Sequence, residues 1–172
     1  WLAFQRFRED SLADFAKKLT QTVRQIRPDA TVTHQFSPVL HGWHLGQTVG
    51  IAEASDYASG DFYGGRRQQR LAVKVFDAYS TKKPFEFMTS RCVTLYDHTS
   101  VKSDDELFLH ALTTLANGGA YFFIDAINPD GTLEESFYRR LQALNGKLAP
   151  FKNMIASHRP VPSAEVGIYF SM

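Results

Sequence analysis

Apolar positions along this chain follow two periods, one typical of helices and one typical of strands. Between Ser11 and Pro28 they recur at three- and four-residue steps, which predicts an amphipathic helix with a capping box formed by Ser11 and Asp14. The next run, ATVTHQF at 30–36, is rich in β-branched residues and predicts a strand. The polar stretch that follows, SPVLHGWHLGQTVG, predicts a long loop.

Two further pairs of strand and helix follow in the middle of the chain. A short strand is predicted at 55–58, and the helix after the glycine pair GG carries its apolar residues on one face. The run PFEFMTSR at 84–91 predicts a third strand. Ser103 and Glu106 then offer a capping box to a third amphipathic helix, which a second glycine pair ends.

A fourth pair completes the alternation. The run YFFIDAI at 121–127 predicts a strand, and Thr132 with Glu135 is predicted to cap the last helix. Four β/α units in this order predict parallel strands joined by helical crossovers. The fold class is therefore α/β, as a small doubly wound sheet or as the C-terminal half of a TIM (β/α)8 barrel. In both, functional side chains lie at the carboxyl ends of the strands.

Polar, acidic and aromatic residues gather at those predicted strand ends. Such a mixture is typical of carbohydrate sites, because sugar hydroxyls bind carboxylates and amides while the C–H faces of sugars stack on aromatic rings. The candidate residues are His34, Gln35, Trp43, Asp56, Asp61, Thr89, Arg91 and Asp125.

Several of these residues also have a structural interpretation. Asp125 can accept hydrogen bonds from the turn that follows it, and Arg91 can form a salt bridge with Asp125 instead of binding a hydroxyl. A large aromatic side chain such as Trp43 is costly to leave exposed to solvent, so we expect a sugar or a neighbouring subunit to pack against it. Asp61, at the exit of its strand, is the best candidate carboxylate. Glu86 comes early in its strand, where a structural ion pair is the simpler role.

The composition limits the partners and the compartment. The 172 residues are 44% hydrophobic, enough for a globular core, and 19 basic against 18 acidic residues leave a net charge of +1. This balance gives no electrostatic support for binding to nucleic acid or to a membrane, and no apolar run is long enough to cross a bilayer. A single cysteine suits a reducing compartment, so we expect a cytoplasmic protein.

The motifs give no support for a metal, a nucleotide or a nucleophilic serine. His41 and His44 have no nearby carboxylate to complete a metal site, and the run GGRRQQR at 64–70 lacks the Walker spacing. No G-x-S-x-G motif is present. We therefore expect no cofactor and no metal, and a carbohydrate as the partner.

Four motifs in order, VTHQFSP, SDYASGDFYGG, PFEFMTSR and LANGGAYFFIDAINPDGTL, carry a resemblance to known proteins. They resemble the C-terminal half of the catalytic barrel in the group called hypothetical glycoside hydrolase 6. That group overlaps glycoside hydrolase family 151, whose characterised activity is α-L-fucosidase, and is more distantly similar to families 29 and 42. The resemblance covers residues 1–155.

The resemblance implies a division of the chain and a set of roles. Residues 1–155 would form half of a barrel, and residues 156–172 a linker and the start of a following domain, since AEVGIYFSM is similar to the first strand of the trimerisation domain of family 42 β-galactosidases. A retaining α-L-fucosidase would carry its nucleophile upstream of Trp1. The general acid would then be Asp61, with Glu53 or Glu86 as the next choices, and His34, Gln35, Trp43, Arg91 and Asp125 would contact the sugar.

Two alternatives to a fucosidase stay open. A family 42 β-galactosidase would place its nucleophilic Glu near the end of the seventh strand, where this chain has Met88 and Thr89, with Glu86 two to three residues too early. A non-catalytic α/β binding or assembly module is the rival from another class. Half a barrel would leave sheet edges and an apolar face exposed, so the fragment is expected to be inactive alone and to form homo-oligomers.

Overall fold

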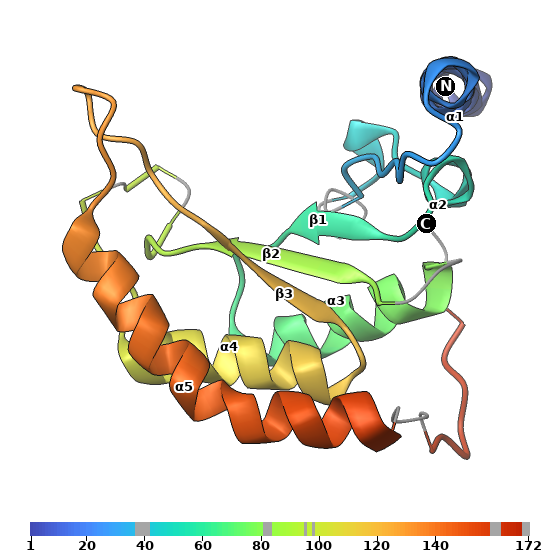
Figure 1. Cartoon of the computed structure of the whole chain (residues 1–172). Helices are drawn as coiled ribbons and strands as arrows, with labels where there is room; N and C mark the ends of the chain where they lie inside the picture. Colours follow the sequence, from blue (N-terminus) through green and yellow to red (C-terminus); the bar gives the residue numbers. More distant parts are fainter. Residues whose placement is uncertain (37–41, 81–83, 95, 98, 159–162, 170–172) are drawn as a thin grey trace.

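The computed structural model describes residues 1–36, 42–80, 84–94, 96–97, 99–158 and 163–169. Three short strands form one parallel sheet in the order β1-β2-β3, with β1 at Ser59–Asp61, β2 at Glu86–Ser90 and β3 at Ala120–Ile124. Figure 1 shows α3, α4 and α5 on one side of this sheet and α1 with α2 beyond its β1 edge. The chain is thus an α/β protein with parallel strands, which fits part of a (β/α)8 barrel.

The first helix is longer than its sequence pattern predicts. Helix α1 spans Leu2–Ile26, so it begins nine residues before the predicted capping box. Ser11 lies inside it and donates a 2.6 Å hydrogen bond from its hydroxyl to the Phe7 carbonyl one turn back, a bond that serine makes readily in helix interiors. The capping box of Ser11 and Asp14 is therefore wrong.

The first predicted strand, at 30–36, forms one isolated β-bridge in the structure. Among the described residues, the 30–36 segment contributes a single parallel bridge, between Gln35 and Ser59, and Phe36 N–H donates to the Ser59 carbonyl at 2.8 Å. The structure therefore shows three strands in the described ranges, and the expectation of four strands is not met. The second strand is also displaced, from the predicted 55–58 to Ser59–Asp61.

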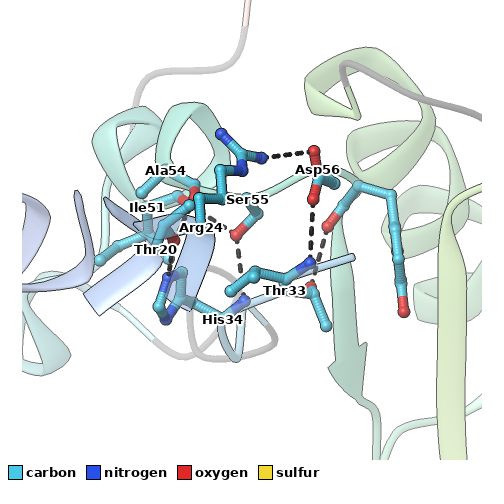
Figure 2. A network of polar contacts seen from close by, with 10 residues as sticks. Thr20, Arg24, Thr33, His34, Ile51, Ala54, Ser55 and Asp56 are labelled. Atoms are coloured by element: carbon cyan, nitrogen blue, oxygen red, sulfur yellow. Dashed lines mark hydrogen bonds and ion pairs between the residues drawn. The ribbon is translucent and has the colours of Figure 1, made fainter. Parts of the chain in front are cut away.

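Side chains take the place of strand partners along the 30–36 segment (Figure 2). The Val32 amide donates to Asp56 Oδ2 at 2.9 Å, and the His34 amide donates to Ser55 Oγ at 3.0 Å. The Thr33 hydroxyl donates to the Tyr57 carbonyl at 2.9 Å. Because the Ser55 and Asp56 side chains and the Tyr57 carbonyl already bond to the 30–36 segment, residues 55–57 connect α2 to β1 and do not extend β1.

Two short helices occupy part of the stretch predicted as a loop. The 3₁₀ helix η2 spans Trp43–Leu45 and helix α2 spans Val49–Ala54. Thr48 caps α2, because its side chain accepts a hydrogen bond from the Gly50 amide at 3.3 Å.

Three longer helices cover one face of the sheet. They are α3 at Arg66–Tyr79, α4 at Asp104–Ala116 and α5 at Glu135–His158. Phe76 on α3 packs against Phe85 and Phe87, with ring centroids 6.4 and 6.2 Å apart, and α4 and α5 enclose a second apolar cluster around Leu107 and Phe137. The helical face of the sheet is therefore the hydrophobic core.

Of the three predicted helix caps, one agrees with the structure. Ser103 Oγ accepts from the Glu106 amide at 3.2 Å, which confirms the cap of α4. Thr132 instead donates from its amide and its hydroxyl to Asp130 in the preceding turn, and Glu134 accepts from the Ser136 amide at the start of α5. The predicted domain boundary at 155 falls inside α5, which ends at His158.

Candidate functional site

The face of the sheet opposite the helices carries three layers of side chains. Paired residues of parallel strands point to the same face, and alternate residues of one strand do the same. From the amino to the carboxyl ends, the layers are Ser59, Glu86 and Ala120, then Asp61, Met88 and Phe122, then Ser90 and Ile124. Phe122 is 48% exposed, so this face is only partly covered within the described part of the chain.

Glu86 lies in the layer nearest the amino ends of the strands. It is the first residue of β2, and its Oε1 accepts a 2.8 Å hydrogen bond from the Ser59 hydroxyl on β1. Burial, followed by the charges of Glu86 and Asp56, raises the pKa of Tyr57. Glu86 thus lies on the face opposite the helices, in the layer farthest from the carboxyl edge.

Asp61 is the last residue of β1, at the carboxyl end where the sequence placed it. The following Phe62 amide donates to the Met88 carbonyl at 2.8 Å, which fixes the exit of the strand. Tyr63 lies near the Asp61 carboxylate. Burial, followed by the charge of Asp61, raises the pKa of Tyr63 to about 12, so the phenol stays protonated. Sequence reasoning missed Tyr63, although its place two residues after a strand-end acid was a usable signal.

Arg91 and Asp125 pair with each other. The guanidinium and the carboxylate form a buried ion pair, with 7% and 12% of their side chains exposed, and the Arg91 guanidinium also lies over the Phe137 ring at 5.4 Å. Asp125 Oδ1 additionally accepts from the Ala126 amide at 2.7 Å. The geometry therefore agrees with a structural salt bridge between Arg91 and Asp125.

His34 and Asp56 belong to a polar network that attaches α1 to the 30–34 segment (Figure 2). The Thr20 hydroxyl donates to the Ala54 carbonyl at 2.8 Å, so in its 2.8 Å contact with His34 it accepts from Nε2. Arg24 donates to Asp56 at 2.6 Å. Burial lowers the pKa of His34. Both side chains contact α1, and the structure does not bring them to the carboxyl edge with Asp61.

Glu53 also lies apart from Asp61. It is an exposed residue of α2, 3.8 Å from the Lys17 ammonium on α1. Gln35 is exposed at the single bridge to β1, and its carbonyl accepts from Gln47 at 2.7 Å. Trp43 opens η2, but its side chain, like the whole of His41, lies outside the part of the chain that the structure describes.

A buried lysine at the end of β2 escaped the sequence reasoning. Lys102 is 4% exposed, and its ammonium donates to the Ser90 carbonyl at 2.6 Å and to Thr89 Oγ1 at 3.0 Å. Thr89 is fully buried on the helical side of β2, so it does not face the layer of Asp61. A lysine just before a helix cap carries no sequence signal of burial.

The described residues offer neither a metal site nor a membrane-spanning helix. Those ranges hold no group of three or more His, Cys, Asp and Glu side chains placed to bind a metal ion. None of the helices in the same ranges combines the length and the apolar character needed to cross a bilayer.

Comparison with known families decides the broad class. The model of the glycoside hydrolase family 42, described as beta-galactosidase, matches residues 1–138. The chain belongs to this family. No curated protein and no solved structure matches it significantly.

Membership of family 42 makes the chain a glycoside hydrolase domain with a carbohydrate as its substrate class. The match extends from α1 into the first turn of α5, so it includes all three strands and Asp61. The sequence motifs favoured an α-L-fucosidase, whereas this match agrees better with the β-galactosidase alternative.

Proposed function

We propose that this chain forms part of a β-galactosidase-like glycosidase that removes terminal sugars, with the substrate bound at the carboxyl ends of the strands. The observation that supports this most strongly is the match of the beta-galactosidase family over residues 1–138. The parallel sheet agrees with it, because parallel α/β folds bind substrates at the carboxyl edge, and Asp61 is the carboxylate at the end of β1.

Within this proposal Asp61 is the general acid. Glycoside hydrolysis needs one carboxyl group that protonates the departing glycosidic oxygen and a second that acts as nucleophile or activates water. The phenol of Tyr63 stays protonated beside Asp61, which gives the site a neutral hydrogen-bond donor. Glu86 is the second choice, one layer deeper on the same face. We assign the second catalytic carboxyl group to β/α units outside this chain, since a closed barrel needs about eight strands.

An α-L-fucosidase is the second candidate for one specific reason. The last two residues of β2 are Thr89 and Ser90, and the one acid of that strand, Glu86, is its first residue. If β2 is the seventh strand of the barrel, the glutamate expected there in a β-galactosidase is displaced. A fucosidase, with its nucleophile on an earlier strand, tolerates this arrangement.

Release of nitrophenol from aryl glycosides by the full-length protein tests the proposal. Nitrophenyl β-D-galactoside should be hydrolysed faster than nitrophenyl α-L-fucoside. Faster hydrolysis of the fucoside supports the second candidate instead. Hydrolysis of neither, together with retained binding of galactose or fucose, supports a non-catalytic module and contradicts both.

Two further properties stay predictions of this proposal. The 172-residue chain alone should bind sugar weakly and hydrolyse nothing, because one of its two catalytic carboxyl groups lies elsewhere. A cytoplasmic location rests on its single cysteine, Cys92, which is free and fully buried.

A further inference from the structure

Among the described residues, the buried ammonium of Lys102 donates to neutral acceptors only. Its hydrogen bonds go to the Ser90 carbonyl at 2.6 Å and to Thr89 Oγ1 at 3.0 Å. Within the described ranges it has no carboxylate within salt-bridge distance, since the charge of Glu106 acts on it from farther away. Burial lowers the pKa of Lys102, and the charge of Glu106 opposes that change.

The backbone of Lys102 closes the loop that leaves β2. Its amide donates to the Arg91 carbonyl at 2.8 Å, so the two ends of the 91–102 loop are tied together. Its carbonyl accepts from Arg140 on α5 at 2.8 Å. Lys102 therefore connects the end of β2, the start of α4 and the side of α5.

A charge in this position is costly, which raises the question of what it does. Removing an ammonium from water without an ionic partner costs free energy, and apolar residues of similar volume often replace buried charges without loss of stability. Perturbed, buried titratable groups gather at functional sites. Lys102 meets this description at the carboxyl edge, where Arg91 and the Asp125 carboxylate also lie.

We propose that Lys102 is a positioning residue for the sugar-binding edge, whose ammonium holds the last two residues of β2 and the root of the 91–102 loop in the conformation that receives the substrate. This inference rests on the proposed function, because it assigns the substrate to the carboxyl edge. Lys102 acts through Thr89, Ser90 and the loop, and its own ammonium does not touch the sugar.

The kinetic test uses the full-length protein and its aryl glycoside substrate. In Lys102→Met we expect KM to rise about tenfold, because a displaced strand end and loop bind the sugar less well, while kcat changes by less than about threefold. Thr89→Val removes one acceptor and keeps the charge, so its KM should rise less. Lys74→Met, at an exposed lysine of α3, is the matched control and should leave both constants unchanged.

Cys92 provides a readout that does not depend on catalysis. Its side chain is fully buried at the root of the loop, and its amide donates to Ser90 Oγ at 3.0 Å. If Lys102 keeps the start of this loop in place, its loss should expose the thiol. A thiol reagent should then label Cys92 at least about tenfold faster in Lys102→Met than in the wild type, as measured by mass spectrometry of its peptide.

Four outcomes decide the matter. Unchanged KM and unchanged labelling of Cys92 in Lys102→Met overturn the inference, and so does a fall in kcat alone with normal labelling. If Lys102→Met does not fold, Thr89→Val decides by the same two measurements. A wild-type protein that hydrolyses no glycoside overturns the proposed function, and the role of Lys102 in holding the loop is then judged from the labelling of Cys92.

Discussion

Arg91 and Asp125 form a buried ion pair that joins the exit of β2 to the exit of β3. The Arg91 amide donates to the Ile124 carbonyl at 3.0 Å, so backbone and side chain make the same connection. Two residues predicted to contact sugar are thus engaged with each other. Their first role is to hold the carboxyl edge of the sheet together, beside the loop that Lys102 closes.

Breaking this pair should destabilise the fold. Asp125→Asn leaves the Arg91 guanidinium buried without its carboxylate, and such a loss costs about 3–5 kcal/mol in the free energy of unfolding. Urea unfolding measures it. The double variant Arg91→Met with Asp125→Asn should lose less than the single variant, because no buried charge is then left unpaired.

An exposed ion pair gives the control for that experiment. Arg27 and Asp29 are 3.1 Å apart with most of both side chains in solvent, so Asp29→Asn should leave the unfolding curve unchanged. Equal effects of Asp125→Asn and Asp29→Asn would show that burial of the Arg91 pair does not matter. A raised KM in folded Asp125→Asn would show that this carboxylate also contacts the sugar.

The parallel order of the strands could be predicted from the sequence, and the strand ends could not. Strand β2 lies within two residues of its prediction at both ends, whereas β3 begins one residue early and ends three residues early, at Ile124. The 30–36 segment has an equally good strand pattern. It fails to form a strand because Ser55 and Asp56 accept its amide hydrogens, and a pattern of apolar residues does not show such long-range side-chain bonds.

The candidate site was predicted in the same uneven way. Asp61 lies at a carboxyl strand end as predicted, although β1 spans Ser59–Asp61 and not the predicted residues 55–58. His34 was predicted to lie at a strand end and Glu53 was a next choice for the general acid. In the structure α2 carries Glu53 beside Lys17, and the His34 side chain contacts Thr20. Burial of a lysine depends on the packing of three elements, which a single sequence does not show.

The glycine before β3 is required by packing. A Cβ at Gly119 would collide with the Phe85 ring and would meet Thr114 Cγ2 at 2.9 Å. Gly119→Ala should therefore destabilise the protein by about 1–3 kcal/mol, the usual cost of overpacking. Thermal unfolding measures this cost.

Gly146 offers the opposite case in the same protein. It lies inside α5, and a Cβ there meets no described atom within 4 Å. Gly146→Ala should leave stability unchanged or raise it by up to about 1 kcal/mol, since alanine is the better helix former. Destabilisation by both substitutions to the same extent would contradict this account of Gly119.

The protein should become less stable as the pH is lowered, because of His110. Burial, with smaller effects from the charges of Lys102 and Arg66, lowers the pKa of His110 to about 4, although Glu106 lies 3.9 Å from its Nε2. Between that value and the ordinary histidine pKa near 6.5, the unfolded chain binds a proton that the folded chain does not. Lowering the pH from 7 to 4.5 should therefore cost about 2–3 kcal/mol of unfolding free energy.

His110→Leu isolates that contribution. His110 is 2% exposed and its Nδ1 has no hydrogen-bond partner among the described residues, so leucine should be tolerated at neutral pH. Urea unfolding of this variant should depend less on pH over the same interval. The remaining slope comes in part from His34, whose pKa burial also lowers. An unchanged slope would show that His110 is not the group responsible.

The isolated chain should associate with itself. Strand β3 is the last strand of the described sheet, and Phe122 on it is 48% exposed, as are large apolar residues of α1 such as Phe4, Phe7 and Phe15 at 53%, 66% and 60%. Such surfaces promote pairing between copies. Light scattering should give a mass of at least two chains, and a stable species of 19.4 kDa would contradict this.

The most direct test of the whole account is kcat/KM of the full-length protein with Asp61→Asn, on the aryl glycoside that the wild type hydrolyses best. If Asp61 is the general acid at the carboxyl end of β1, kcat/KM should fall by about 10²–10⁴ while the unfolding temperature stays the same. A variant that keeps kcat/KM within threefold of the wild type would contradict the assignment of catalysis to this edge of the sheet.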